Sequence, residues 1–529
     1  KPAGQPMGHR PVRLHKAARP ELSALGPGFL DHRLPLRRHP IRRGLQSDLP
    51  GRQQGQGPQR AGAVVFAQQQ FSFKDGKFKI AQFTDLHWTP RSLACTETEA
   101  TICAVLKAEH PDIAILSGDV VTEDPAIDGW KSVIRIFDEA KVPFVVTMGN
   151  HDAEHMAKDD IYDLLLESPY YAGAKGPEGI MGCGNCVIPV YGSKNREKVE
   201  ALLYCMDSND YQPNKLYGPY DWIHFDQIAW YREQSARFTK ENNGSPVPAL
   251  AFFHIPLLEY NEIAGDGKTF GNNREGKVAS ANINSGMFAS FIDMKDVMGV
   301  FAGHDHDNDY LGINKGIVLG YGRVTGADAY GELTRGARII ELYEGKFRFD
   351  TWITTPSGRE ATYYYPSGLN SEEERTADYL PAVKNVSSPK QGVAYTYYEG
   401  KCKRVAGIAS CLKVKEGVMK NISIKEAAVA DHFAYDFHTL IQIPEKGIYR
   451  FYTFSDDGSM LYIDGKLVVD NDGGHSARRA EGKIALEKGF HELHLLYFED
   501  YMGQELEVGF SGLDFPEVPL QDEMLFLPN

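Results

Sequence analysis

The sequence of 529 residues predicts an α/β domain followed by a separate all-β domain. From Phe71 to about residue 355, apolar strand patterns alternate with helical patterns, which is typical of a sheet with helical crossovers. Acidic residues and histidines follow several of these strands directly. From Gly392 onward, strand patterns are joined by Asp-Gly turns, which indicates antiparallel sheets. A chain of this length is expected to form two or three folded units.

The N-terminal region differs in composition from the rest of the chain. Residues 1–60 are rich in Arg, Pro, Gly and Gln and show no sustained apolar period, which predicts disorder. The small, apolar stretch from Ala61 to Ala67 is similar to the end of a secretory signal peptide. A short apolar patch without such a role is the alternative. We therefore predict a disordered or targeting segment over residues 1–70, and an exported protein, periplasmic or extracellular.

Several elements are predicted between residues 71 and 355. Strands are expected at 78–83, 112–116, 143–147, 247–253 and 297–301, and helices at 97–109, 130–140 and 226–240. A long insertion rich in Tyr and Asn is expected near residues 170–225, and a polar linker over 356–391. The all-β domain then occupies residues 392–529. In open α/β sheets, ligands bind at the carboxyl ends of the strands, so the site is expected there.

The charge distribution excludes one class of partner. The formal net charge is -14 although residues 1–60 are basic, so the rest of the chain is strongly acidic. Binding to a nucleic-acid polymer depends on Lys and Arg that neutralise phosphates, and we therefore expect no such partner. No stretch approaches 18 consecutive apolar residues, so no transmembrane segment is predicted.

Five short motifs carry the chemistry. They are Asp85-Leu-His87, Gly118-Asp119, Gly149-Asn150-His151-Asp152, His254 after two phenylalanines, and Gly303-His304-Asp-His306. Carboxylate and amide oxygens combined with imidazoles suit Mn, Fe or Zn. Two adjacent metal ions need a bridging anion, which a carboxylate at a strand end supplies. The three glycines allow the backbone to turn sharply and to approach the metals closely.

These motifs, in this order, resemble the calcineurin-like metallophosphoesterase superfamily over about residues 76–354. The resemblance implies a four-layer α/β/β/α sandwich and two divalent or trivalent metal ions (Fe, Mn or Zn). The implied ligands are Asp85, His87 and His306 for the first metal, Asn150, His254 and His304 for the second, and Asp119 as the bridge. It further implies that His151 stabilises or protonates the leaving oxygen and that Asp152 orients His151.

A narrower resemblance follows from four segments. His254–Tyr260, Asn284–Phe288, Gly303–Asp309 and Arg335–Arg338 are similar to the plant and fungal purple-acid-phosphatase-like proteins. Thr122 replaces the metal-binding tyrosine of true purple acid phosphatases, and His87 stands where those enzymes have glycine. Without tyrosinate-to-iron charge transfer, we expect a colourless protein.

The resemblance implies a metal-dependent phosphoesterase that hydrolyses phosphate esters, phosphomonoesters favoured, by attack of a hydroxide activated by two metals. The expected partner is a small phosphate-ester substrate. Two alternatives stay open. One is a phosphodiesterase acting on nucleotides or other diesters, and the other is a glycan-binding surface protein with a vestigial phosphatase core.

The all-β domain has a resemblance of its own. The segments Phe451–Gly465 and Val468–Asn471 resemble the PA14 β-sandwich family, over about residues 392–513. The resemblance implies calcium held by Asp456 and Asp457, and binding to a glycan or cell-surface carbohydrate. The simpler alternative is that these aspartates only form a turn with Gly458 between two strands.

Overall fold

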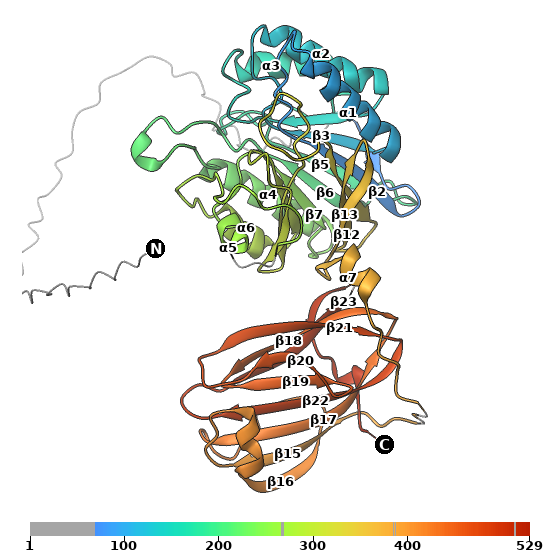
Figure 1. Ribbon diagram of the computed structural model, residues 1–529, viewed down its shortest axis with the longest axis vertical. Coiled ribbons are helices and arrows are strands. Elements are labelled where there is room, and N and C mark those ends of the chain that lie inside the picture. The colour runs from blue at the N-terminus through green and yellow to red at the C-terminus, as the bar shows by residue number, and fades with distance from the viewer. Residues whose placement is uncertain (1–68, 266–268, 385, 387, 513–514, 529) are drawn as a thin grey trace, which may run out of the picture. The chain divides into compact units, whose positions relative to one another are not determined.

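The computed structural model describes residues 69–265, 269–384, 386, 388–512 and 515–528, which form an α/β part and an all-β part (Figure 1). The predicted targeting segment, with Ala61 to Ala67, lies outside the described residues except for its last two positions. Within these ranges, every helix is too short or too polar to span a membrane.

Two seven-stranded sheets form the centre of the α/β part. The first sheet has the strand order β1 (Phe71–Ser72), β5 (Cys186–Tyr191), β6 (Val199–Cys205), β7 (Ala249–Phe252), β8 (Val297–Ala302), β10 (Ile317–Tyr321) and β9 (Leu311–Asn314). The second has the order β14 (Leu369–Asn370), β13 (Gly358–Tyr365), β12 (Phe349–Thr355), β11 (Ala337–Tyr343), β2 (Lys77–Phe83), β3 (Ile113–Ser117) and β4 (Phe144–Thr147). Strands β2, β3 and β4 run parallel, as do β6, β7, β8 and β10.

Helices cover the outer face of each sheet (Figure 1). The second sheet packs against α1 (Ala94–Glu109), α2 (Ala126–Ala140) and α3 (Lys158–Leu165), and the first against α4 (Phe225–Glu241), α5 (Tyr260–Ala264) and α6 (Met287–Met294). A third apolar cluster fills the space between the two sheets. The predicted four-layer α/β/β/α sandwich is therefore confirmed.

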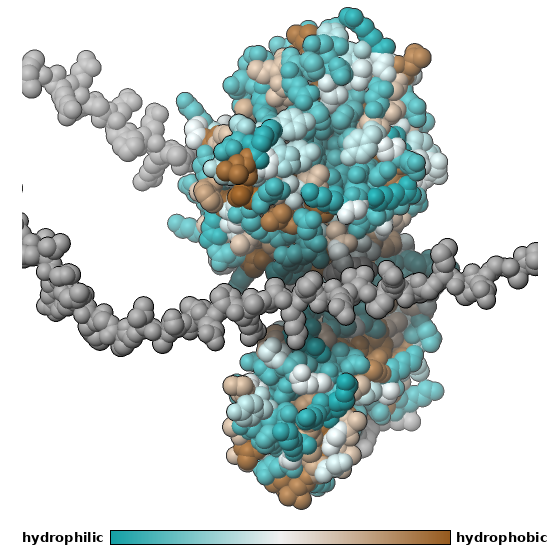
Figure 2. Space-filling view, turned by 60° about the vertical axis from the view of Figure 1, so that its left-hand side comes forward, coloured by the Kyte–Doolittle hydropathy of each residue, from teal (hydrophilic) through white to brown (hydrophobic). Residues whose placement is uncertain are grey.

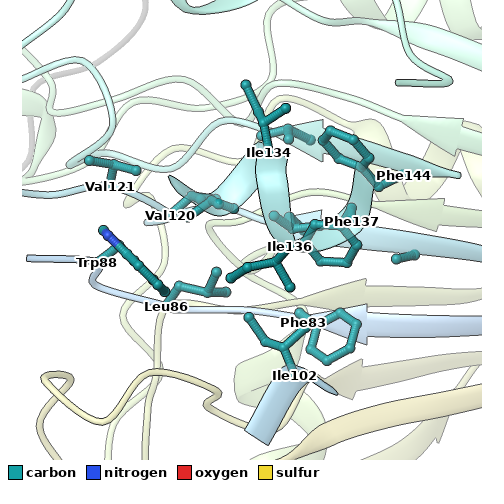
Figure 3. Packing of buried hydrophobic residues seen from close by; sticks show 14 of the residues in the cluster. Phe83, Leu86, Trp88, Ile102, Val120, Val121, Ile134, Ile136, Phe137 and Phe144 are labelled. Atoms are coloured by element: carbon teal, nitrogen blue, oxygen red, sulfur yellow. The ribbon is translucent and has the colours of Figure 1, made fainter. Parts of the chain in front are cut away.

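Strand β2 shows how the sequence produces these layers. Phe78 and Ile80 belong to the cluster between the sheets, whereas Ala81 and Phe83 face the helices. Alternate side chains of a strand point to opposite faces, so a strand covered on both faces needs apolar residues at nearly every position. Figure 3 shows the helix-side cluster, in which Phe83 of β2 lies near Ile102 of α1 and Phe137 of α2.

The all-β part is a sandwich of two antiparallel sheets. One has the strand order β16 (Leu412–Met419), β15 (Val393–Glu399), β17 (Phe433–Ile443), β22 (Gly489–Glu499), β19 (Ser459–Ile463) and β20 (Lys466–Asn471), with β25 (Leu525–Phe526) paired to β17. The other has the order β21 (Arg478–Leu486), β18 (Gly447–Asp456), β23 (Glu505–Gly512) and β24 (Phe515–Pro519). Aromatic and aliphatic side chains from both sheets form its core. The predicted all-β fold is confirmed.

Two sequence-based boundaries were wrong. The range 170–225, predicted as an insertion, contains β5 and β6, and β6 lies inside the first sheet next to β7. The range 356–391, predicted as a linker, contains β13, β14 and α7 (Ser371–Thr376), and β13 pairs with β12. Tyr and polar residues dominate β13, so its composition did not separate it from a linker.

The surface is mostly hydrophilic on the face shown in Figure 2, with hydrophobic residues in small patches. Large exposed hydrophobic side chains include Leu216, Phe225 and Met502. In the α/β part, the apolar residues of the strands are buried in three interior clusters. The polar residues that follow the strands lie outside these clusters and can form a site.

Candidate dinuclear metal centre

The predicted ligands meet at the carboxyl ends of five strands. Asp85 follows β2, Asp119 follows β3 and Asn150 follows β4, while His254 follows β7 and His304 follows β8. Parallel strands end at the same edge of a sheet, so each sheet brings its own ligands together. The two sheets then place both sets side by side across the interior.

Six of the predicted ligands form two groups. In each group the candidate ligand atoms lie within 4.8 Å of one another; the groups are Asp85, His87 and His306, and Asp119, His254 and His304. The Asp119 carboxylate lies between them, because its Oδ2 is 3.1 Å from His254 Nε2 and 3.8 Å from His87 Nε2. This position is the one that a bridging carboxylate requires.

Buried polar atoms at this site are unpaired. Asn150 Oδ1 and His304 Nε2 are buried, and neither has a hydrogen-bond partner among the residues that the structure describes. Buried polar atoms are almost always paired in folded proteins, so unpaired ones call for a ligand. Oxygen and imidazole nitrogen donors are those that Fe, Mn and Zn accept. The seven residues therefore fit a pair of metal ions.

Backbone carbonyls fix the orientation of two of the imidazoles. His254 Nδ1 lies 2.9 Å from the carbonyl oxygen of Ser117, and His306 Nδ1 lies 3.3 Å from that of Tyr330. An N–H donated to a carbonyl leaves the other ring nitrogen free to accept a metal, and this pattern is usual for metal-binding histidines. In both rings the Nε2 atom therefore faces the carboxylates.

The electrostatics of the site favour neutral imidazoles at two positions. Burial lowers the pKa of His87 to about 4 and that of His304 to about 3, so both rings keep a lone pair at neutral pH. At His254, burial opposes protonation, but the charge of Asp119 raises the pKa to about 10. The Asp119 carboxylate thus stabilises a positive charge beside it. A bound cation would supply that charge in place of the proton on His254.

The backbone at the ligands is strained. Asp85, His87, Asp119 and His304 have φ values of 51°, 41°, 50° and 80°. Non-glycine residues seldom adopt this left-handed region, and such residues concentrate at functional sites. The surrounding sheets hold the ligands in a geometry that an isolated loop would not keep.

The three motif glycines leave room that the ligands occupy. A Cβ at Gly118 would lie 2.4 Å from the His254 ring, and one at Gly149 would lie 2.2 Å from Asp119 Oδ1. A Cβ at Gly303 would lie 2.8 Å from Asp85 Oδ2. Only Gly118 among them also has a positive φ, of 89°. Close approach is therefore the shared reason for glycine here, as predicted.

The predicted role of Asp152 was wrong. Its carboxylate accepts backbone N–H groups at 2.8 Å from Gly149, 3.0 Å from Asp119, 2.7 Å from Val120 and 3.1 Å from Val121. Both oxygens of the Asp152 carboxylate accept backbone N–H groups, so the side chain joins the loop after β3 to the loop after β4. Burial and the nearby Asp119 charge raise the pKa of Asp152 to about 7, against these hydrogen bonds.

His151 instead pairs with Glu154, a residue that the sequence reasoning missed. His151 Nδ1 lies 3.0 Å from Glu154 Oε1, and its Nε2 lies 3.3 Å from the Tyr211 hydroxyl. That hydroxyl accepts a hydrogen bond of 2.9 Å from Asn150 Nδ2. The His151 ring also lies beside His87, with centroids 5.7 Å apart. His151 is therefore next to the metal groups but outside them.

Three tyrosines surround the site, and the sequence reasoning identified none of them. Tyr211 contacts His151, Tyr220 packs edge-on against His304 at 4.5 Å, and Tyr330 stacks on His306 at 3.8 Å between centroids. Tyr211 and Tyr220 lie in the range 170–225, which the sequence marked as rich in Tyr. The tyrosine content of that range was the only available signal.

In the all-β part, Asp456 and Asp457 lie together with Glu499, whose carboxylate completes a third group of metal-ligand type. Asp457 also accepts backbone N–H groups of His475 at 2.7 Å and Asp500 at 2.8 Å. Burial, then the charge of Asp457, raises the pKa of Glu499 to about 8. Asp456 and Asp457 thus lie where β18 gives way to β19, as the simpler alternative held, and they also form an acidic group with Glu499.

Comparisons with known proteins agree with both parts of the fold. The model of the calcineurin-like phosphoesterase family matches residues 78–308, and the PA14 domain model matches residues 389–518. The chain is 33% identical over 311 residues to probable inactive purple acid phosphatase 29 of Arabidopsis thaliana, which is 53% of this chain and 80% of that protein. It is 30% identical over 312 residues to probable inactive purple acid phosphatase 28 of the same plant, 53% of this chain and 78% of that protein.

A fungal protein is also similar. Phosphatase DCR2 of Saccharomyces cerevisiae is 29% identical over 267 residues, 45% of each chain. The fold and the paired Asp/His groups define a protein of the metallophosphoesterase class with an appended PA14 domain. The chain belongs to the calcineurin-like phosphoesterase family, and its relatives are purple-acid-phosphatase-like proteins.

The Gly149→Ala variant tests the close approach at Asp119. The added Cβ would lie 2.2 Å from Asp119 Oδ1, so we expect the carboxylate to shift and the metal content to fall. Metal analysis of the purified protein measures this. Gly265→Ala is the control, because its Cβ would come no closer than 3.7 Å to the Asn261 carbonyl oxygen. Equal metal content in both variants would contradict the constraint.

Asp152→Asn and Glu154→Gln separate the two carboxylates. The amide introduced by Asp152→Asn would turn an NH2 group toward backbone N–H donors, so we expect the free energy of unfolding to fall by about 1–3 kcal/mol. Glu154 is half-exposed, so Glu154→Gln should leave stability and metal content unchanged while hydrolysis slows roughly 10- to 100-fold. Thermal unfolding, metal analysis and kinetics distinguish them. The same defect in both variants would refute the assignment.

Proposed function

We propose that the protein is a metal-dependent phosphoesterase that hydrolyses phosphate esters, with phosphomonoesters favoured. The observation that carries the proposal is the gathering of six predicted ligands in two groups around the Asp119 carboxylate, with the unpaired oxygen of Asn150 as the seventh. A structural role for one buried histidine is ordinary, but four histidines and two carboxylates brought together from two sheets are costly to bury unless cations balance the carboxylate charge. The matched family model and the name of the yeast relative support the same reaction class.

Asp85, His87 and His306 would hold one ion, Asn150, His254 and His304 the other, and Asp119 would bridge them. Bound there, two such ions supply a nucleophile from water at neutral pH and neutralise the phosphoryl oxygens. The chain itself contributes the proton for the leaving oxygen. His151 lies beside His87, its Nδ1 is held by Glu154 and its Nε2 lies 3.3 Å from the Tyr211 hydroxyl, and we assign this positioned ring as the general acid.

The names of the two plant relatives raise the alternative of a vestigial core. A chain that had lost catalysis would be under no constraint to keep strained ligands, the close-packed glycines or the general acid. This chain keeps all of them, together with the unpaired Asn150 oxygen. These features favour turnover over a purely binding role.

A kinetic comparison tests the proposal. The wild type, loaded with Mn, Fe or Zn, should hydrolyse an aryl phosphate, while Asp119→Ala loses metal and activity and His151→Ala keeps metal but slows about 10²- to 10⁴-fold. Equal activity in the wild type, Asp119→Ala and His151→Ala would contradict the proposal. Faster turnover of the bis-aryl diester than of the monoester would move the assignment to the phosphodiesterase alternative.

For the PA14 domain we propose calcium-dependent binding of a glycan or cell-surface carbohydrate, in a protein that acts outside the cytoplasm. The group of Asp456, Asp457 and Glu499 supports it, because Ca²⁺ prefers carboxylate oxygens. The composition of Ala61 to Ala67 supports export. Glycan binding without turnover of any phosphate ester would favour the vestigial-core alternative.

Calcium titration of the full chain tests this site. We expect Asp457→Asn to lose one equivalent of bound Ca²⁺, because it removes a carboxylate from the group. Asp470→Asn, an exposed aspartate of the same domain outside the group, should bind as the wild type does. Unchanged calcium binding in Asp457→Asn would leave the aspartates with the turn alone.

A further inference from the structure

A second histidine cluster lies on the all-β part, apart from both sites above. His438 on β17 and His494 on β22 face each other directly across the antiparallel pair. Asp436 lies two residues before His438, so its side chain points to the same face. The neighbouring β17 residues Tyr435 and Phe437 point into the core. The three polar side chains therefore stand on the outer face of the sheet, on its rigid central strands.

The three side chains converge on one point. Asp436 Oδ1 is 2.8 Å from His494 Nε2 and 2.9 Å from His438 Nε2. The rings are stacked with centroids 4.2 Å apart and an interplanar angle of 11°, so both Nε2 atoms project in the same direction. All three candidate ligand atoms lie within 4.8 Å of one another. No backbone rearrangement is needed to bring them to one ion.

The surroundings favour a ligand over a simple ion pair. One imidazole is sufficient to pair a carboxylate, yet two are directed at the same oxygen. Tyr462 on β19 stacks on His494 at 5.6 Å and holds that ring in place. On the other side, Ala394 of β15 faces His438 with only a methyl group, and the His438 side chain is 52% exposed. The cluster is thus preformed on one side and open to solvent on the other.

The hydrogen bonds agree with this geometry. Burial opposes ionisation of Asp436, but its contacts with His438 and His494 lower the pKa of its carboxyl group. The hydrogen bond to Asp436 raises the pKa of His438. A carboxylate that contacts two imidazoles at one place can share a divalent cation with them there.

We propose that Asp436, His438 and His494 form a surface site for one zinc-type divalent transition-metal ion. Two imidazoles and one carboxylate are a ligand set that Zn²⁺ accepts, and three protein ligands leave a coordination position for water or an external donor. The ion would be additional to the dinuclear centre and chemically distinct from the oxygen-only group of Asp456, Asp457 and Glu499. The PA14 domain would then carry one nitrogen-rich and one oxygen-rich cation site.

Zinc stoichiometry of the full chain tests the proposal. After chelator treatment and equilibrium dialysis against Zn²⁺, the double variant His438→Gln/His494→Gln should hold one equivalent less zinc than the wild type. Aryl-phosphate hydrolysis should be unchanged, because the dinuclear centre is intact. His432→Gln is the matched control, since His432 is half-exposed, lies 3.3 Å from one carboxylate, Asp500, and belongs to none of the ligand clusters found among the described residues.

Asp436→Asn provides an independent variant should the double substitution impair folding. It keeps the size of the side chain and an acceptor oxygen for the histidines, and it should also lose one zinc equivalent. Equal zinc content in the wild type, Asp436→Asn and the double variant would overturn the proposal. Loss of zinc to the same extent in His432→Gln would overturn it too, because binding would then follow surface histidines in general.

Discussion

The Asp152 carboxylate holds the candidate metal centre together. It accepts four backbone N–H groups, from Gly149 and from the consecutive residues Asp119, Val120 and Val121. The four bonds are buried, so the loops after β3 and β4 are fixed as one unit. Asp119 and Asn150 lie in these two loops. Asp119, which lies between the two ligand groups, is therefore positioned by a hydrogen bond from its own backbone N–H to the Asp152 carboxylate.

Around this unit, the fold supplies the remaining ligands from both sheets. The interior between the sheets is apolar. The ligands follow directly after the buried strands β2, β3, β4, β7 and β8. Left-handed backbone at Asp85, His87, Asp119 and His304 costs free energy at each residue. Burial of the strands in the three apolar clusters offsets that cost. The strained residues can therefore be held at the ends of strands that are buried on both faces.

The sequence predicted the residues whose pattern is local and missed those whose role depends on distant packing. The ligands in motifs such as Asp85-Leu-His87 and Gly149-Asn150-His151 could be predicted from the sequence alone. The apolar strands before these motifs predicted that the site lies at the strand ends. Glu154 was missed although it is three residues from His151, because the adjacent Asp152 offered a carboxylate closer in sequence. Only the structure shows that backbone N–H groups occupy Asp152.

The boundaries that failed did so for the same reason. Strands β5 and β6 lie between polar, Tyr-rich loops, and their pairing with β1 and β7 is long-range. Strand β13 lies next to the edge strand β14; its exposed start carries charged residues, whereas Tyr363 and Tyr365 enter the cluster between the sheets. Strand patterns that depend on a partner far along the chain leave little signal in their own segment.

Charge explains how an acidic chain can attract an anionic substrate. The net charge is -14, so a phosphate ester meets unfavourable potential over most of the surface. At the centre, only Asp85 and Asp119 bring negative charge, while the other five ligands are imidazoles or an amide and two of the imidazoles are kept neutral by burial. The charge of two bound ions would exceed that of two carboxylates, and the local field would then be positive. Tyr220 and Tyr330 pack against His304 and His306, and Tyr211 contacts His151. Two bound ions would therefore reverse the sign of the chain's charge at the site proposed for the phosphoryl group.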